Sequence, residues 1–396
     1  MAVNSKSVVH AEEHLPQATT SASHSPRAET DKPLASGGNV WVWGADGGTV
    51  PSAGSSPADS LVPRLAAKLS GKGIKGLAFG DKAAAAVTNK GELYLWRVGE
   101  EEPTLTEHKG VQQVACGRNG LIAALTDKGD VLLWDARTHA EGGLHPPASS
   151  KEAGSKAGAE TITQVDCGSG HVAMVTSRGR VLVLGDNNYG QLSHIWDNYW
   201  LTVWHARRIK RNPRTRHAIL LDDGAVFMLG SVHLSGLKGS TLYTDSPVLV
   251  PLTRDSKSVE KLGRIIKLSC GGEHTLALTN YGVLLAWGNG MYGQVPDNQG
   301  KHINTAHPVL RAPFFNAEGK EFINNEVKEL QCGNEHCLAL TKGGDVWSFG
   351  RNDRGQCGVG NRAHQKTPHK VTKLQSRKDK ISAIACGQHT SAAIEE

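Results

Sequence analysis

Cysteine and histidine recur at one spacing along this chain, and together they can bind zinc. The pattern Cys-Gly, two residues, His occurs three times, beginning at Cys167, Cys270 and Cys332. A structural zinc ion needs four ligands at about 2.0–2.3 Å. Each copy supplies two ligands, and copies that belong to separate structural units are expected not to converge. We therefore predict no metal and no cofactor, with Cys packing as a small apolar residue and His bonding to backbone near a turn.

The remaining cysteines support the same interpretation. Of the seven in the chain, two (Cys337 and Cys357) lie outside the recurring position. One cysteine per repeat is typical of small buried side chains and not of a disulfide framework, which indicates a reducing, intracellular compartment. The cysteines at the recurring position are Cys116, Cys167, Cys270, Cys332 and Cys386.

A basic segment is the second group with chemical potential. Six basic residues fall within ten positions, in a chain of net charge +6. Such a cluster can bind phosphates through counterion release, and arginine can grip carboxylates bidentately, so an acidic protein or RNA is the expected partner. The alternative is a solvated basic face. Pro213 predicts an edge strand or loop here. The six residues are Arg207, Arg208, Lys210, Arg211, Arg214 and Arg216.

Three tryptophans just upstream form the third group. Trp196, Trp200 and Trp204 recur every four residues, which at helical spacing places the indoles on one face. Exposed, they would make a binding patch, since Trp and Arg are enriched at interaction hot spots. The alternative, which we favour, is that they cover the outside of the fourth and fifth repeats.

Signatures of catalysis on small molecules are missing from the sequence. It contains neither a G-x-x-x-x-G-K-[ST] phosphate loop nor a G-x-S-x-G nucleophile elbow. We expect no enzymatic activity.

The residues above are carried by a short unit that is clearest between Val327 and Gly358. An apolar alternating segment runs into Cys332-Gly333, a second runs from His336 to Thr341, and a third ends at Gly350. Short segments joined by glycine turns predict an antiparallel meander. Such a sheet cannot bury both faces alone, so copies of it must stack.

Seven copies of the third strand are recognisable by a glycine five residues before a large apolar residue. The pairs are Gly38/Trp43, Gly91/Trp96, Gly129/Trp134, Gly179/Leu184, Gly224/Leu229, Gly282/Trp287 and Gly344/Phe349. The first copy lacks its preceding strands, and the chain ends with that missing pair, Ile381 to Gly387 and His389 to Ile394. Pairing the two ends removes the exposed edges of an open stack. We predict an all-β, seven-bladed propeller of four-stranded antiparallel blades, closed by the N- and C-terminal strands in one blade.

These motifs resemble a known family. Cys-Gly-x-x-His, then Ala-Leu-Thr, then Tyr-Gly-Gln as at 189–191 and 292–294, are similar to the regulator-of-chromosome-condensation repeat. The resemblance covers Gly38 to Glu396 and implies the same propeller fold. The plant UV-B photoreceptor of this family uses clustered tryptophans, but Trp43, Trp96, Trp134 and Trp287 stand at the structural strand end, so photoreception is not expected.

The sequence outside the repeats divides into a tail and three insertions. Residues 1–38 are polar and poor in large apolar side chains, which predicts an extended tail before a propeller over 39–396. Insertions are expected near 136–160, 231–262 and 296–326. The last two contain predicted fourth strands, at Pro247 to Val250 and Pro308 to Leu310. No run of 18 apolar residues predicts a membrane span.

The function that follows is an interaction scaffold without catalysis, a subunit or assembly factor of a larger intracellular complex. The basic fifth repeat would dock an acidic protein or RNA. The alternative is a guanine-nucleotide exchange factor for a small GTPase, because the resemblance implies the activity of the family's founding member; none of its exchange residues matches a position here. Mitochondrial relatives and a pI near 8.9 favour mitochondrion over nucleus or cytoplasm, although the acidic residues of the tail are poor for a presequence.

Overall fold

The computed structural model describes the larger part of the chain. The chain divides into two units, Met1–Lys32 and Pro33–Glu396, and every described residue belongs to the second. Residues 1–37 of the predicted tail (1–38) and the insertion at 136–160 lie outside the described residues. The described ranges are 38–45, 59–135, 161–185, 200–201, 206–212, 216–231, 243–250, 263–296, 302–308, 327–374 and 380–396.

The seventh sheet shows how one repeat forms. Strands β22 (Val327–Cys332), β23 (His336–Thr341), β24 (Val346–Gly350) and β25 (Gln365–Lys370) pair in that order, all antiparallel. The turn between β23 and β24 needs Gly344, whose φ of +89° is left-handed, a conformation that glycine adopts without a steric cost. The predicted meander is confirmed, and a 3₁₀ turn, Thr372–Leu374, follows β25.

The other sheets repeat this arrangement. Five of them have four described strands each, and the third sheet has three. The second sheet contains β3 (Ile74–Phe79), β4 (Ala83–Thr88), β5 (Leu93–Arg97) and β6 (Thr104–Leu105). The third contains β7 (Val111–Cys116), β8 (Leu121–Thr126) and β9 (Val131–Asp135). The fourth contains β10 (Ile162–Cys167), β11 (His171–Thr176), β12 (Val181–Gly185) and β13 (Trp200–Leu201). The fifth contains β14 (Ala206–Asn212), β15 (Arg216–Leu221), β16 (Val226–Ser231) and β17 (Tyr243–Leu249). The sixth contains β18 (Ile265–Cys270), β19 (His274–Thr279), β20 (Leu284–Asn289) and β21 (His302–Pro308).

The predicted fourth strands in two insertions exist, with different bounds. β17 contains the predicted residues 247–249 but begins at Tyr243, and β21 ends at Pro308, where the prediction placed its start. The prediction rests on the apolar runs, whereas both strands begin in largely polar sequence, Tyr-Thr-Asp-Ser in β17 and His-Ile-Asn-Thr in β21. An outermost strand pairs on one side only, so it does not need an apolar pattern.

Both chain ends contribute to the remaining sheet. Its order is β2 (Ser60–Leu65), β1 (Val40–Gly44), β27 (Thr390–Glu395), β26 (Ile381–Cys386). Trp41 is the partner of Ala393 in the β1–β27 register. The carboxylate of Glu395, 2% exposed, accepts hydrogen bonds from Asn39 Nδ2 at 2.8 Å and Trp41 Nε1 at 3.0 Å. The predicted closure by paired ends is confirmed.

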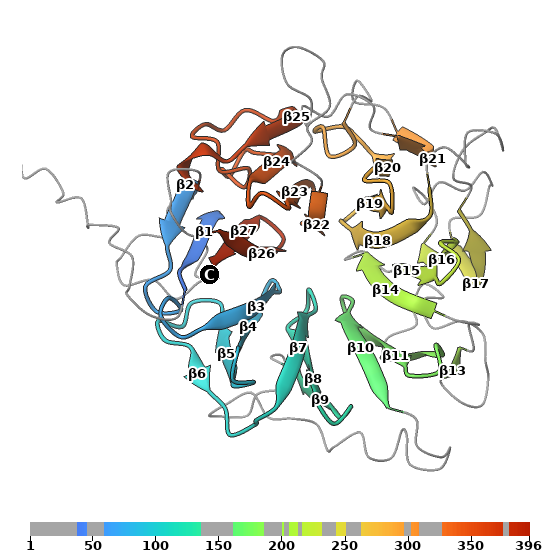
Figure 1. Ribbon diagram of the computed structural model, residues 1–396, viewed down its shortest axis with the longest axis horizontal. Helices are drawn as coiled ribbons and strands as arrows, with labels where there is room; N and C mark the ends of the chain where they lie inside the picture. Colours follow the sequence, from blue (N-terminus) through green and yellow to red (C-terminus); the bar gives the residue numbers. More distant parts are fainter. Residues whose placement is uncertain are drawn as a thin grey trace, which may run out of the picture. The chain divides into compact units, whose positions relative to one another are not determined.

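The seven sheets form a closed ring. Figure 1 shows the first strand of each sheet nearest the centre, and these strands contact one another in the cyclic order β3, β7, β10, β14, β18, β22, β26 and back to β3. Seven apolar clusters fill the spaces between neighbouring sheets. Trp43, Trp96, Trp134 and Trp287 are all at most 2% exposed within them. The chain is therefore an all-β, seven-bladed propeller, and these tryptophans pack between its blades.

Among the residues that the structure describes, no helix is long and apolar enough to cross a membrane.

Candidate functional site

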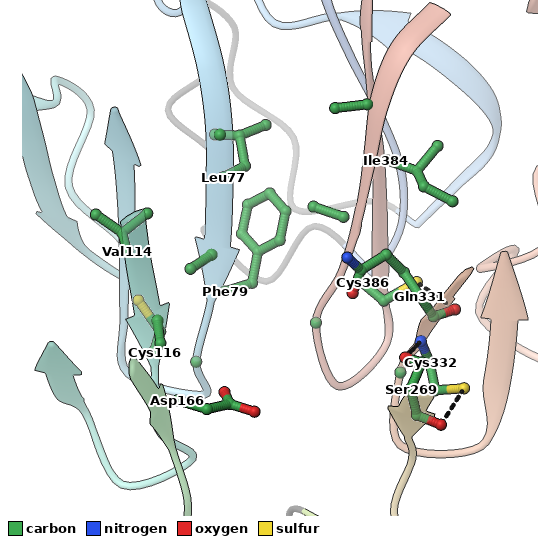
Figure 2. A pocket seen from close by; sticks show the side chains of 18 of the residues that line it. Leu77, Phe79, Val114, Cys116, Asp166, Ser269, Gln331, Cys332, Ile384 and Cys386 are labelled. Carbon is green, nitrogen blue, oxygen red and sulfur yellow. Dashed lines mark hydrogen bonds between the residues drawn. The ribbon is translucent and has the colours of Figure 1, made fainter. Parts of the chain in front are cut away.

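A cavity of about 270 Å³ occupies the centre of the ring. Its wall is formed by first strands from six of the seven sheets, so it follows the propeller axis. Figure 2 shows Leu77 and Phe79 of β3 on one side of it and Ile384 and Cys386 of β26 on the other. The wall therefore combines apolar side chains with thiols at the recurring cysteine position.

Those recurring cysteines join neighbouring first strands. In three of them the sulfur lies near the carbonyl oxygen of the residue just before the matching cysteine of the preceding sheet. The Sγ to O distances are 3.4 Å for Cys167 to Ala115, 3.5 Å for Cys332 to Ser269 and 3.6 Å for Cys386 to Gln331. None of the seven cysteines is in a disulfide in the structure. The three thiols named above act as weak donors between blades.

The glycine and histidine of the motif form one packing unit. A Cβ placed on Gly168, Gly271 or Gly333 would lie 2.0–2.1 Å from Cε1 of His171, His274 or His336, respectively. The imidazole therefore occupies the space where any other residue would have a side chain. All three histidines are at most 1% exposed. The spacing Cys-Gly-x-x-His is explained by this contact, because the imidazole packs against the backbone of the glycine three residues earlier.

The same histidines reach across to the next sheet. His274 Nε2 lies 3.0 Å from Cys337 Sγ, and His336 Nε2 lies 2.9 Å from Ser391 Oγ. Cys337 Sγ is in turn 3.6 Å from Cys332 Sγ. The expectation that Cys and His of different repeats cannot converge is therefore wrong. The imidazole points sideways, between the blades, and not along its own sheet.

Burial sets the protonation of these groups. Burial lowers the pKa of His336 to about 3, helped by the charges of His389 and His274, so the ring is neutral. Burial and donation to Cys332 raise the pKa of Cys337 well above its usual value. For Cys332 burial acts in the same direction, but the Cys337 hydrogen bond and the charge of His274 outweigh it and lower the pKa to about 5.

Charged side chains stand on the loops that follow the first and third strands of the seventh sheet. Arg351 donates to Glu335 Oε2 at 2.6 Å and to both carboxylate oxygens of Asp353, at 3.0 and 2.7 Å. The Arg351 guanidinium also lies 5.2 Å from the ring of Tyr292. Between the second and third sheets, Arg118 pairs with Asp81 at 2.9 Å. These ion pairs satisfy the charges of Arg351 and Arg118 within the protein.

The predicted basic segment occupies the fifth sheet. Arg207, Arg208, Lys210 and Arg211 belong to β14, the innermost strand, and Arg216 begins β15. Arg214 lies outside the described residues, as does Pro213. The structure describes the course of β14 and not its side chains. The prediction of an edge strand or loop rested on Pro213 and stays a prediction.

The three tryptophans do not share a described helix. Trp200 belongs to β13, which pairs with β12 as the outermost strand of the fourth sheet. Trp196 and Trp204 lie outside the described residues. Helical spacing was therefore the wrong interpretation at Trp200. A spacing of four residues also suits an extended strand, in which residues i and i+4 lie on one face.

Comparison with known proteins identifies the repeat. Models of the regulator of chromosome condensation (RCC1) repeat match residues 162–191, 265–294, 327–356 and 343–394. These segments contain all three Cys-Gly-x-x-His motifs.

Similarity to individual proteins extends over most of the chain. It is 27% identical to the human E3 ubiquitin-protein ligase HERC2 over 388 residues, covering 89% of this chain but 8% of that much longer protein. The crystal structure of human WBSCR16 superposes with a TM-score of 0.72 at 19% identity, covering 91% of this chain and 99% of that one. Prp20p of Saccharomyces cerevisiae, whose structure was described together with its binding to Gsp1p and histones, gives 0.71 at 16% identity, with 92% of each chain covered. These two structures share the fold.

Proposed function

We propose that this chain, which contains repeats of the RCC1 type, is a non-catalytic interaction scaffold, a subunit or assembly factor of a larger intracellular complex. The basic segment of the fifth blade, residues 207–216, is the docking element in this proposal. Its partner is an acidic protein or RNA.

One observation carries the proposal. β14 holds the first-strand place in its sheet, yet its sequence replaces the Cys-Gly exit with arginine and lysine. First strands elsewhere end in Phe79, Cys116, Cys167, Cys270, Cys332 or Cys386, each followed by glycine. The propeller is therefore built six times without this charge, so folding does not require it. A cluster of positive charge that folding does not need is best explained by a partner.

Charge reversal tests the docking element. We expect Arg207→Glu, Arg208→Glu and Arg211→Glu together to weaken binding to single-stranded RNA or to polyglutamate, whichever the wild type binds. For RNA, three lost phosphate contacts lower the slope of log affinity against log salt by about 2, since each contributes about 0.7. Fluorescence anisotropy over a salt series measures both quantities.

A matched control separates local from global charge. Lys90→Glu, Lys128→Glu and Lys366→Glu change three exposed lysines elsewhere and also take the net charge from +6 to 0. This control should keep the wild-type slope. Arg→Gln at the three arginines gives a neutral version if the glutamates prevent folding. Equal affinity and slope in wild type and both arginine variants would remove the docking role, as would equal losses in the lysine control.

The second candidate function is nucleotide exchange on a small GTPase. The likeness to Prp20p, described with its binding to Gsp1p, favours testing it. Release of fluorescent GDP from a Ran-type GTPase is the measurement. Under the scaffold proposal the chain leaves the release rate unchanged, and an acceleration would replace that proposal.

We also propose a mitochondrial location over a nuclear or cytoplasmic one, on the basis of the basic pI of 8.9. Subcellular fractionation with an antibody to the chain tests this location. Recovery in the nuclear or cytosolic fraction would contradict it.

A further inference from the structure

Two thiols and one imidazole meet between the sixth and seventh blades. His274 comes from β19, whereas Cys332 and Cys337 face each other across β22 and β23 as register partners. The separations are 3.0 Å for His274 Nε2 to Cys337 Sγ and 3.6 Å between the two sulfurs. All three donor atoms lie within 4.8 Å of one another. His274 and Cys337 are at most 1% exposed.

From this geometry we propose that His274, Cys332 and Cys337 form a zinc site. Tetrahedral zinc with bonds of about 2.0–2.3 Å holds its ligand atoms roughly 3.5–3.8 Å apart. The separations of 3.0 and 3.6 Å lie within roughly 0.5 Å of these values, and the third pair, His274 and Cys332, is no more than 4.8 Å apart. Two thiolates balance the charge of one Zn²⁺, and their two protons leave to solvent on binding. A water molecule completes the fourth position.

The cavity provides the route of entry. Cys332 lines the cavity at the ring centre, as do Ser269 and Cys270 of the neighbouring first strand. Figure 2 shows Cys332 and Ser269 together at the cavity wall. Ion and water therefore reach the cluster from the Cys332 side, while Cys337 and His274 close it from behind. This site is separate from the basic segment of the fifth blade and does not rest on the proposed scaffold function.

Equivalent positions in other blades show that the fold does not require the second thiol. The recurring cysteine is the register partner of Ile122, Val172, Thr275, Cys337 or Ser391 in successive sheets. The propeller accepts apolar and hydroxyl side chains there. Only at Cys337, among these positions, does a thiol meet both a recurring cysteine and a histidine of the preceding blade. Folding alone therefore leaves the choice of cysteine at 337 unexplained.

Ser391 supplies the matched control. It occupies the same place beside His336 and Cys386 that Cys337 occupies beside His274 and Cys332. Cys337→Ser therefore copies a side chain that this fold already holds, and should keep the structure. Ser391→Cys should create a second set of one histidine and two cysteines. The same geometry therefore predicts that Cys337→Ser removes a zinc site and that Ser391→Cys adds one.

Zinc titration of the full-length protein, reduced and stripped with a chelator, tests the proposal. We expect one equivalent of Zn²⁺ for wild type, none for Cys337→Ser and two for Ser391→Cys. Loss of one ligand should weaken affinity by more than about 100-fold, because even partners outside the coordination sphere cost 10–100-fold. Co²⁺ in place of zinc should give the visible bands of a tetrahedral thiolate site. Cys357→Ser removes a buried thiol outside the cluster and should bind like wild type.

Two results would overturn the zinc site. Equal zinc binding by wild type and Cys337→Ser places the ion elsewhere. The second result is a reduced wild-type protein that binds no zinc. If air oxidation of that protein also lowers its mass by two hydrogens through a Cys332–Cys337 disulfide, the two cysteines are a redox pair instead. If metal-free Cys337→Ser keeps the thermal unfolding transition of the metal-free wild type, its failure to bind zinc is not caused by misfolding.

Discussion

The seventh blade and the blade closed by the two chain ends have one backbone plan with different origins and different chemistry. All strands of the seventh come from 327–370, whereas the closing blade takes two strands from each end of the chain. Each receives a histidine from the preceding blade, His274 in one case and His336 in the other. The partner is a thiol in the first and a hydroxyl in the second. Backbone pairing is therefore set by the repeat, while the side chain that meets the histidine is free to vary.

The largest difference expected between these blades is their dependence on the chain end. Removing residues 390–396 deletes β27, the central partner of β1 and β26. All six residues of β27 are buried, so the ring would open and expose the apolar clusters on either side of the closing blade. We expect loss of the cooperative thermal transition, measured by circular dichroism.

Removal of Glu396 alone is the control, because this residue follows β27 and is exposed. It should leave the transition unchanged. A protein without β27 that melts at the wild-type temperature would mean that closure contributes nothing to stability.

A smaller effect separates the glycines that begin the two hairpin loops. A Cβ on Gly333 would lie 2.1 Å from His336 Cε1 and 2.6 Å from Gly387 O, whereas a Cβ on Gly387 would meet only Phe79 Cβ at 2.8 Å as a severe contact. His336 is buried between blades and cannot swing away. We expect Gly333→Ala to lower the free energy of unfolding by about 1–3 kcal/mol or more. Gly387→Ala should cost less.

Urea unfolding of both variants, analysed with a common m-value, measures that difference. Equal losses would show that the imidazole can move aside, and would remove the packing explanation for the Cys-Gly-x-x-His spacing.

A third difference, which appears only in acid, is the pH dependence of stability that belongs to His336. Its folded-state pKa of about 3 lies below the unfolded value of about 6.5, so between these values the unfolded chain binds the extra proton. Its stability contribution is complete above about pH 6.5 and is lost as pH falls toward 3. His336→Gln should reduce the slope in this window by up to about 1.4 kcal/mol per pH unit.

The free energy of unfolding at several pH values, for wild type and His336→Gln, gives this slope. His369→Gln changes an exposed histidine on β25 and serves as the control. If His336→Gln and wild type have parallel pH profiles, then folding does not lower the pKa of His336, and the ring is not held neutral in acid by its burial beside Ser391.

The backbone plan could be predicted from the residues because its signals are local. A glycine at a left-handed turn, such as Gly344, and alternating apolar residues in β22 report on the conformation of a few neighbouring positions. Ring closure was also predictable. The chain begins with a third strand that lacks its first and second strands and ends with a first and second strand that lack a third, so pairing the two ends completes one blade. The polar starts of β17 and β21 carried no such signal, and their bounds were missed.

The cluster of His274, Cys332 and Cys337 could not be predicted from local sequence patterns. No local pattern in the sequence between residues 274 and 337 predicts that an imidazole of one blade lies 3.0 Å from a thiol of the next. That distance depends on how two sheets pack side by side, which involves the ring as a whole and the glycine that leaves room for His274. Short-range pattern thus specifies each strand and turn, because those depend on neighbouring residues. Contacts between blades needed the assembled propeller, because they join residues some 60 positions apart.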